Sequence, residues 1–276
     1  MSFVQRFMRS PEGLLGAAVL VLLAALALLA PVLFPRDPLS IVGPALTSPF
    51  TDWSLPLGTD RLGRNVLAQL VHGARASLLV GLAAALAAMV IGASVGTIAG
   101  FAGGFVDEAL MRVVDAFQTV PGFLLALAFV SVIGASMPVV VLAIALGAWT
   151  GPARLARAEV LSIRERDYVA SARVIGMHPV QIAFREILPN ALPPVLALSA
   201  VIVAGAVLTE SALSFLGLGD PNIVTWGSMI AEGRAVLRSS PFLSVVPGVA
   251  LVVTVLAVYL FGEGLADALS RRKVRL

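Results

Sequence analysis

The sequence of 276 residues has no cysteine, a single lysine and little charge. The lack of cysteine excludes disulfides, thiolate chemistry and cysteine-ligated metal sites, and it leaves the redox compartment undetermined. Charged residues make up 13% of the chain and hydrophobic residues 59%, whereas about 25% of residues are charged in ordinary soluble domains. This composition excludes a soluble protein and predicts an integral membrane protein.

The net charge of +3 and the pI of about 10.1 could suggest a nucleic-acid partner. The basic residues, however, lie between apolar runs and form no dense patch, so they indicate membrane topology instead. We therefore expect contact with membrane lipid and none with nucleic acid.

Six apolar runs are long enough to cross the membrane, which takes about 20 residues for ~30 Å of hydrocarbon. The first run is too long for the apolar part of a signal peptide, which has roughly 7–15 residues, and no clear small-residue cleavage site precedes Pro31. We therefore expect it to be retained. The predicted spans are residues 13–34, 77–101, 109–133, 137–157, 191–217 and 243–266.

The basic residues are distributed unevenly between the two sides of these spans. One side holds both termini, Arg112 and six arginines from Arg154 to Arg185, as well as Arg6, Arg9, Arg271, Arg272, Lys273 and Arg275. The other side holds fewer: Arg36, Arg61, Arg64, Arg75, Arg234 and Arg238. Because basic residues accumulate in the cytoplasm, the sequence predicts cytoplasmic N- and C-termini.

Two outer segments, 35–76 and 216–242, are longer than a turn, and the second carries Trp226 in a position that suits the membrane interface. Within the second span, small residues recur every four positions at Gly92, Gly96 and Gly100. They share one helix face, so we expect close helix packing there rather than a role in substrate binding.

A polar insert from Arg164 to Asn190 interrupts this apolar chain on the cytoplasmic side. Its sequence predicts a helix over 167–175, a stop at Gly176, and a second helix opened by Pro179 that ends at Pro189. Two interpretations remain open. The insert is either a compact protrusion that contacts a partner or an interfacial pair of helices whose apolar side chains enter lipid, namely Val180, Ile182, Phe184 and Ile187.

The insert carries Ala170-Ser171-Ala172, then Gly176 after three residues, then Glu186-Ile187-Leu188-Pro189 after nine more. This pattern resembles the cytoplasmic coupling loop of permease subunits of bacterial ABC importers. Three positions depart from the family pattern: Ala170 replaces a glutamate, Ser171 an alanine and Glu186 an isoleucine.

Further segments resemble the dipeptide, oligopeptide and nickel "C" branch of these permeases. They are Leu57–Val66 with Asn65 in place of the usual aspartate, Gly73–Leu78, Glu210–Gly219 with Trp226-Gly227, and Gly262–Leu269. The resemblance implies an all-α type I importer fold with six membrane helices and a two-helix coupling loop between helices 4 and 5. It divides the chain into residues 1–76, which hold the N-terminal tail, first helix and outer loop, and a permease core of 77–276 with the coupling loop at 158–190.

The resemblance also implies the partners. They are a sister permease, two cytoplasmic ATPase subunits that bind ATP and Mg, and an extracytoplasmic solute-binding protein. This chain is not expected to be an enzyme or to hold a cofactor or metal, since a P-loop needs a lysine after a glycine-rich turn. The residues implied in coupling to an ATPase are Asp167, Tyr168, Ala170, Ser171, Ala172, Arg173, Gly176, Met177 and Pro179.

Three polar residues in predicted spans are candidates for the translocation pathway: Glu210, Asp115 and Gln118. For Glu210 an internal hydrogen bond or an arginine partner is the favoured interpretation. Arg154, Arg157 and Glu159 are expected at the inner membrane boundary, and His72 and His178 on opposite sides of the membrane, where they cannot share a metal ion.

Two other classes of function compete with this interpretation. An ion-gradient-driven secondary transporter or channel would typically show inverted repeats with interrupted helices, and no convincing repeat is visible. An intramembrane enzyme would need a polar catalytic constellation, which the chain lacks. The cargo stays open among dipeptides, oligopeptides, glutathione-like peptides, nickel complexes and some sugars.

Overall fold

The computed structural model describes residues 3–269, and within that range the chain is helical, with no β-strand. The basic residues predicted on the cytoplasmic side from Arg271 to Arg275 lie outside the described residues. The helices are α1 (Phe3–Phe7), α2 (Pro11–Leu33), α3 (Val66–Ala102), α4 (Gly104–Gln118), α5 (Gly122–Ile133), α6 (Met137–Ala148), α7 (Thr150–Ile163), α8 (Asp167–Val174), α9 (Pro179–Gln181), a π-helix (Ile182–Ile187), α10 (Leu188–Phe215), α11 (Trp226–Arg234) and α12 (Phe242–Leu269).

Four continuous helices are long and apolar enough to span a membrane, namely α2, α3, the helix over Pro179–Phe215 and α12. Two bent pairs, α4 with α5 and α6 with α7, pass the same test when each pair is taken together. Counting each pair as one span gives six spans at the predicted positions, so the all-α architecture is confirmed.

The third and fourth predicted spans are not continuous helices, which corrects the prediction. The α4–α5 pair bends by 80° and the α6–α7 pair by 44°. Pro121 stands at the first break, where it disfavours helical geometry for Val120. Pro152 lies in the first turn of α7, where it cannot donate to the carbonyl of Ala148 and would crowd it.

Two helices extend beyond their predicted limits. α3 begins at Val66, about one-third of its length before the predicted start, because Asn65 caps it by accepting hydrogen bonds from the backbone of Leu67 and Ala68. The second helix of the insert was predicted to end at Pro189, and that prediction is wrong. The chain continues through the π-helix into α10, and the wider π turn accommodates Pro189, which offers no N–H.

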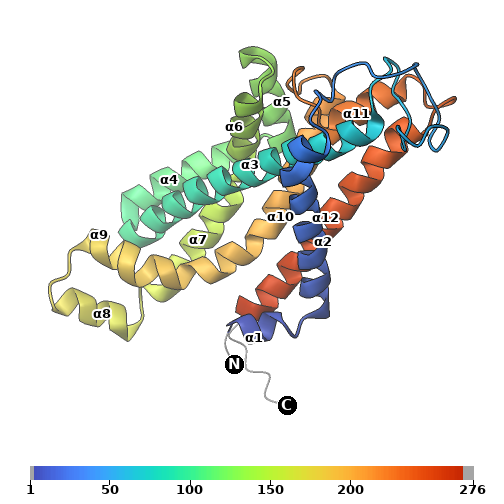
Figure 1. Cartoon of the computed structure of the whole chain (residues 1–276). Helices are drawn as coiled ribbons and strands as arrows, with labels where there is room; N and C mark the ends of the chain where they lie inside the picture. The colour runs from blue at the N-terminus through green and yellow to red at the C-terminus, as the bar shows by residue number, and fades with distance from the viewer. Residues whose placement is uncertain (1–2, 270–276) are drawn as a thin grey trace.

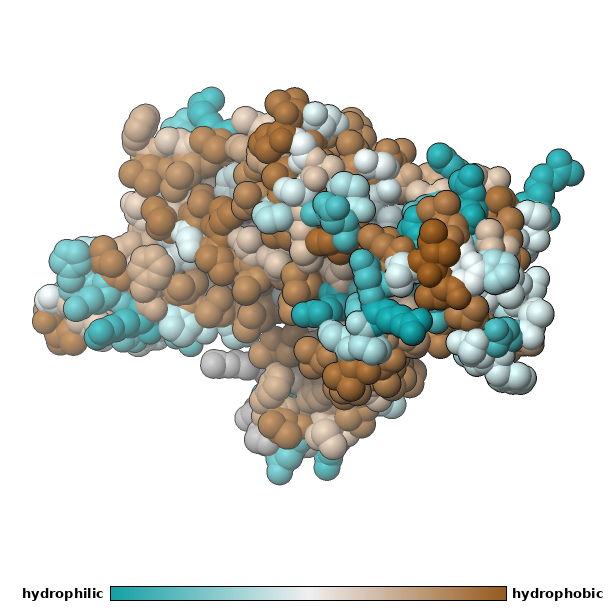
Figure 2. Space-filling model, turned by 45° about the horizontal axis from the view of Figure 1, so that its top comes forward, coloured by the Kyte–Doolittle hydropathy of each residue, from teal (hydrophilic) through white to brown (hydrophobic). Residues whose placement is uncertain are grey.

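The long apolar helices lie between two polar ends of the molecule. In Figure 1, α8 and α9 lie at the lower left and α1 at the bottom, whereas α11 and the segment between α2 and α3 lie at the top right. Helices α3 and α10 run between the two ends, and α12 packs along α2. Figure 2 shows hydrophobic side chains over much of the left and centre of the visible face, with hydrophilic ones at its left end and from right of the centre to its right end.

The predicted close packing through the glycines of α3 is confirmed, and its partner is α7. A Cβ at Gly92 or Gly96 would collide with backbone atoms of Trp149 or Ala153, and one at Gly100 would lie 2.9 Å from the carbonyl oxygen of Arg157. These contacts hold α7 against the C-terminal part of α3, and α7 leads directly into the polar insert.

Candidate functional site

The polar insert folds as two helices joined by a glycine corner, as predicted. Gly176 has a φ of +80° directly after α8. The backbone N–H of Met177 donates to the carbonyl of Ala172 at 3.1 Å, and that of Gly176 donates to Arg173 at 3.1 Å. This pair of bonds is a Schellman motif, which closes the end of α8. We call residues 164–190 the α8–α9 protrusion.

The start of α9 is also fixed locally. Pro179 occupies its first turn, and the ring Nδ1 of His178 accepts a hydrogen bond from the backbone N–H of Val180 at 3.3 Å. The preset φ of proline suits this position, where the N–H would have no helical partner. The two helices therefore meet at a defined angle rather than through a flexible loop.

The protrusion has its own apolar core. Val169 and Ala172 of α8 pack with Ile182 and Ile187 and with the end of α7 at Ile163. The interpretation as helices lying on lipid is therefore wrong for Ile182 and Ile187, which are buried in this cluster. Burial of such side chains contributes roughly 1.5–3 kcal/mol each, so the cluster holds α8 firmly against the membrane helices.

Polar contacts add to this attachment. The guanidinium of Arg164 donates to the backbone carbonyl of Gly100 at 2.9 Å and so joins the protrusion to the end of α3. The hydroxyl of Tyr168 lies 3.4 Å from the carbonyl oxygen of Glu186, which also accepts from Asn190 at 2.7 Å.

Most residues implied in coupling are exposed on the protrusion. Ala172 is buried and Met177 half-buried, whereas the others are exposed: Asp167, Tyr168, Ala170, Ser171, Arg173, Gly176 and Pro179. The sequence reasoning missed Val174 and Ile175, whose side chains are 87% and 76% exposed beside the corner. The sequence carried a signal for this exposed pair, because two branched apolar residues stand directly before a glycine that ends a helix.

The signature segment Leu57–Val66 forms a compact polar cluster. One carboxylate oxygen of Asp60 accepts from the backbone N–H groups of Leu62 and Arg64, and the other accepts from Gln69 of α3 at 2.9 Å. Arg64 bridges Asp60 at 3.6 Å and Glu232 of α11 at 3.5 Å. Burial raises the pKa of Glu232, and the charge of Arg64 opposes that shift.

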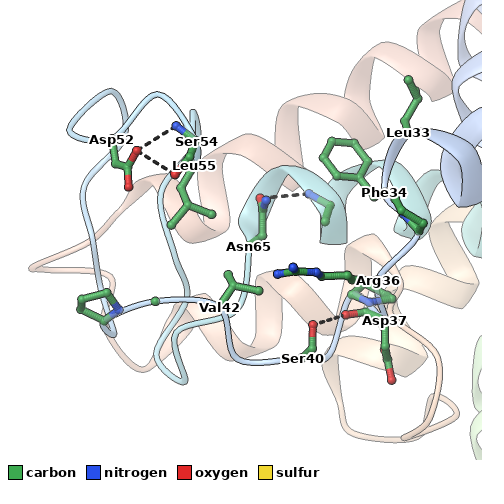
Figure 3. Close-up of a pocket in the computed structure, with 15 residues that line it drawn as sticks. Leu33, Phe34, Arg36, Asp37, Ser40, Val42, Asp52, Ser54, Leu55 and Asn65 are labelled. Carbon is green, nitrogen blue, oxygen red and sulfur yellow. Dashed lines mark hydrogen bonds between the residues drawn. The ribbon is translucent and has the colours of Figure 1, made fainter.

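A cavity of about 400 Å³ lies beside this polar cluster, between the end of α2 and the start of α3. Figure 3 shows the side chain of Arg36 extending between Val42 and Asn65, with Asp37 below it. The opposite wall includes exposed Asp52, whose pKa is lowered by hydrogen bonds from the hydroxyl and backbone N–H of Ser54.

Glu210 is buried where α10, α3 and α11 meet, with 1% of its surface exposed. Its carboxylate accepts hydrogen bonds from Ser214 at 2.7 Å and from Ser77 and Ser211 at 3.3 Å. The backbone N–H of Trp226 donates to the same Ser77 hydroxyl at 3.3 Å. The internal hydrogen bonds favoured for Glu210 are thus present, and they link the three helices.

Asp115 and Gln118 are exposed on α4. Asp115 pairs with Arg154 of α7, and Asp107 of α4 pairs with Arg157. The structure brings the pathway candidates Asp115 and Gln118 together on one helix, and it places Glu210 apart from them on α10.

Two further expectations have an outcome in the described residues. Trp226 does not lie at the lipid interface, because it is 1% exposed and its ring N–H donates to the carbonyl of Leu70 at 3.0 Å. The ring of His72 contacts the carbonyl of Phe34 at 3.0 Å. Within residues 3–269, no group of three or more His, Cys, Asp and Glu side chains is arranged to hold a metal ion.

Known proteins resemble this chain in sequence and in fold. The family described as "Binding-protein-dependent transport system inner membrane component" matches residues 92–275. The chain is 43% identical to the probable peptide ABC transporter permease protein y4tQ of Sinorhizobium fredii, over 97% of this chain and 91% of that protein. It is 35% identical to the di/tripeptide transport system permease protein DppC of Pseudomonas aeruginosa, over 97% and 90%.

The fold also matches a solved structure. A chain of the inward-facing MetNI methionine ABC transporter superposes with a TM-score of 0.61 at 19% identity, covering 74% of this chain and 97% of that one. This likeness concerns the fold, and the sequence relatives extend over nearly the whole chain. The chain therefore belongs to the binding-protein-dependent transport system inner membrane components and is a permease subunit of an ABC transporter.

Proposed function

We propose that this chain forms half of the translocation pathway of an ATP-driven importer of peptides. The peptide cargo is supported by the names of relatives such as the P. aeruginosa di/tripeptide permease and the glutathione permease GsiD of Pectobacterium atrosepticum, which is 34% identical. The importer would comprise this chain, a sister permease, two ATPase subunits that bind ATP and Mg, and a solute-binding protein.

The observation that carries the coupling proposal is the α8–α9 protrusion. It is a rigid corner with exposed apolar residues at its tip, Val174 and Ile175, and a buried core that joins it to α7 and α10. We propose that this tip docks on one ATPase subunit. Closure of the ATPases on ATP would then move α7 and α10 as a rigid body and switch the pathway from inward-open to outward-open.

The same arrangement supports an orientation in the membrane. We propose that α1 and the protrusion face the cytoplasm of a bacterium, in its inner membrane, and that α11 and the segment between α2 and α3 face outward. Arginines concentrate from Arg154 to Arg185, which supports the cytoplasmic placement of the protrusion. The cavity between α2 and α3 and the polar cluster around Asp60 would then lie on the side where a solute-binding protein delivers cargo.

The test is reconstitution of the assembled complex in proteoliposomes with its binding protein. We expect uptake of a labelled dipeptide that requires hydrolysable ATP and that continues when ionophores abolish ion gradients. Uptake that persists without ATP and stops on addition of ionophores would instead identify the chain as part of a secondary transporter.

A further inference from the structure

A polar stripe runs along α4 in the midst of apolar helices. Its exposed members are Glu108, Arg112 and Asp115 of α4 and Thr119 at the helical C-cap, which are spaced by four, three and four residues and so lie on one helix face. The opposite side of α4 packs into the core through buried Val114. We call these four residues, with the adjacent exposed Gln118, the α4 stripe.

Two ion pairs connect α4 to α7, and they differ sharply. Arg157 donates two hydrogen bonds to Asp107, at 2.5 and 2.7 Å, and the Asp107 side chain is 14% exposed. Arg154 donates a single hydrogen bond to Asp115, and these side chains are 51% and 60% exposed. Asp107–Arg157 is therefore a closed structural pair, whereas Asp115–Arg154 is open to its surroundings.

The open Asp115–Arg154 pair also lies farther than the Asp107–Arg157 pair from the charged end of the spans. α4 follows α3 after a turn at Gly103 and runs back beside it, so that Asp115 lies about 12 Å further along the helix axis than Asp107. The turn itself is near Arg164, at the charged end of the spans. Charged side chains exposed to hydrocarbon at that depth are costly, so this face is expected to meet water or polar protein rather than lipid.

We propose that the α4 stripe faces the water-filled translocation pathway and that the Asp115–Arg154 pair contacts the charged ends of the cargo. This inference rests on the proposed function. A free peptide carries an ammonium and a carboxylate, and these groups match the carboxylate of Asp115 and the guanidinium of Arg154. Arg154 uses one of its five N–H donors in the pair, so it can receive a carboxylate without first losing Asp115.

The absence of cysteine from the chain permits a direct test of water access. Thr119→Cys and Leu28→Cys are compared in the assembled complex in nanodiscs, using a charged, membrane-impermeant methanethiosulfonate. Leu28 is exposed on α2, where lipid is expected. Because the reactive thiolate forms in water, we expect T119C to react at least about tenfold faster than L28C. Equal, slow reaction of the two would overturn the proposal, since lipid or the sister permease would then cover the stripe.

Cargo contact is tested by uptake of a labelled dipeptide per assembled complex. Since charge-assisted hydrogen bonds to the cargo would be lost, we expect Asp115→Asn and Arg154→Gln to lower uptake by about tenfold or more at subsaturating cargo. The matched variant Asp107→Asn should instead lower the amount of assembled complex and change uptake per complex by less than about twofold.

These outcomes separate the two levels of the argument. An active wild-type complex in which D115N and R154Q transport normally would overturn this inference and leave the proposed function intact. The same holds if D115N behaves as D107N does, with its only effect on assembly. A wild-type complex that takes up no dipeptide with ATP would instead refute the proposed function and the cargo contact together, while the labelling result would still decide whether the stripe meets water.

Discussion

Replacing Gly176 by valine should uncouple ATP hydrolysis from transport. Gly176 has a φ of +80°, and a Cβ at this position would meet no atom within 4 Å. The substitution therefore introduces backbone strain without a steric clash. Left-handed geometry costs a non-glycine residue about 1–2 kcal/mol, and a branched side chain falls at the upper end of that range.

That strain acts on the two hydrogen bonds that close α8, donated by Gly176 and Met177. A cost of 1–2 kcal/mol shifts a local equilibrium by roughly 5–30-fold, so the open form of the corner would become roughly 5–30-fold more favoured relative to the closed form. α9 would then lose its fixed angle to α8, and the exposed tip would no longer transmit movement to α10. The buried core around Val169 remains, so the complex should still assemble.

The assay is the ratio of dipeptide uptake to ATP hydrolysis in proteoliposomes. We expect this ratio to fall in Gly176→Val, by at most roughly 5–30-fold, and to fall less in Gly176→Asn, by less than about twofold, because asparagine tolerates left-handed geometry. Gly134→Val is a positional control: Gly134 also has a positive φ and open space around its Cβ position, but it lies between α5 and α6, away from the protrusion. Equal ratios in G176V and G176N would refute the reasoning.

Three further predictions concern other contacts. Glu210→Ala should lower the unfolding midpoint of the complex more than Glu210→Gln, because alanine leaves three buried serine hydroxyls without their acceptor, at roughly 1–3 kcal/mol each; equal midpoints would contradict this. Gly96→Ala should destabilise the complex by about 1–3 kcal/mol in a thermal assay because its Cβ would push α7 from α3, whereas Gly151→Ala, which meets no atom, should not. Burial raises the pKa of Glu232 above its ordinary 4.5, so its contribution to stability is fully present below pH 4.5 and is lost as the pH rises through the raised value. Glu232→Gln should therefore reduce the fall in unfolding midpoint over that pH window, and an unchanged slope would contradict the assignment.

The sequence was sufficient to predict features that depend on local chemistry. Apolar length located the spans, the four-residue glycine repeat identified a packing face, and Gly176 with Pro179 specified the corner of the protrusion. Each of these signals is continuous in the sequence and acts through hydrophobic length, the spacing of small residues or a restricted backbone conformation.

Features that depend on tertiary context could not be predicted in the same way. The residues around Pro121 read as one apolar run, yet the chain turns by 80° there. The turn could not be predicted because an apolar composition carries no information about the direction of the helix axis. Pro189 was expected to end a helix, but a π turn accommodates it within a longer one. Trp226 suits a lipid interface by type, and only the packing of α11 against α3 shows that its ring is buried.

The candidate site shows the same division. The exposed coupling residues followed from a family resemblance over Asp167–Pro179, whereas the exposure of Val174 and Ile175 required the structure. Likewise, Asp115 and Gln118 were candidates by sequence, but the contrast between the open Asp115–Arg154 pair and its closed neighbour emerges only when α4 is placed beside α7.

The central claim, that the α8–α9 protrusion docks on an ATPase, is tested most directly by cross-linking from its tip. Val174→Cys provides a single thiol in a chain without cysteine, and Leu28→Cys provides a membrane-facing control. With a short thiol-reactive photo-cross-linker attached in the assembled, transport-active complex, we predict a covalent product between V174C and an ATPase subunit and none from L28C. An active complex in which V174C yields no product with an ATPase would contradict the account.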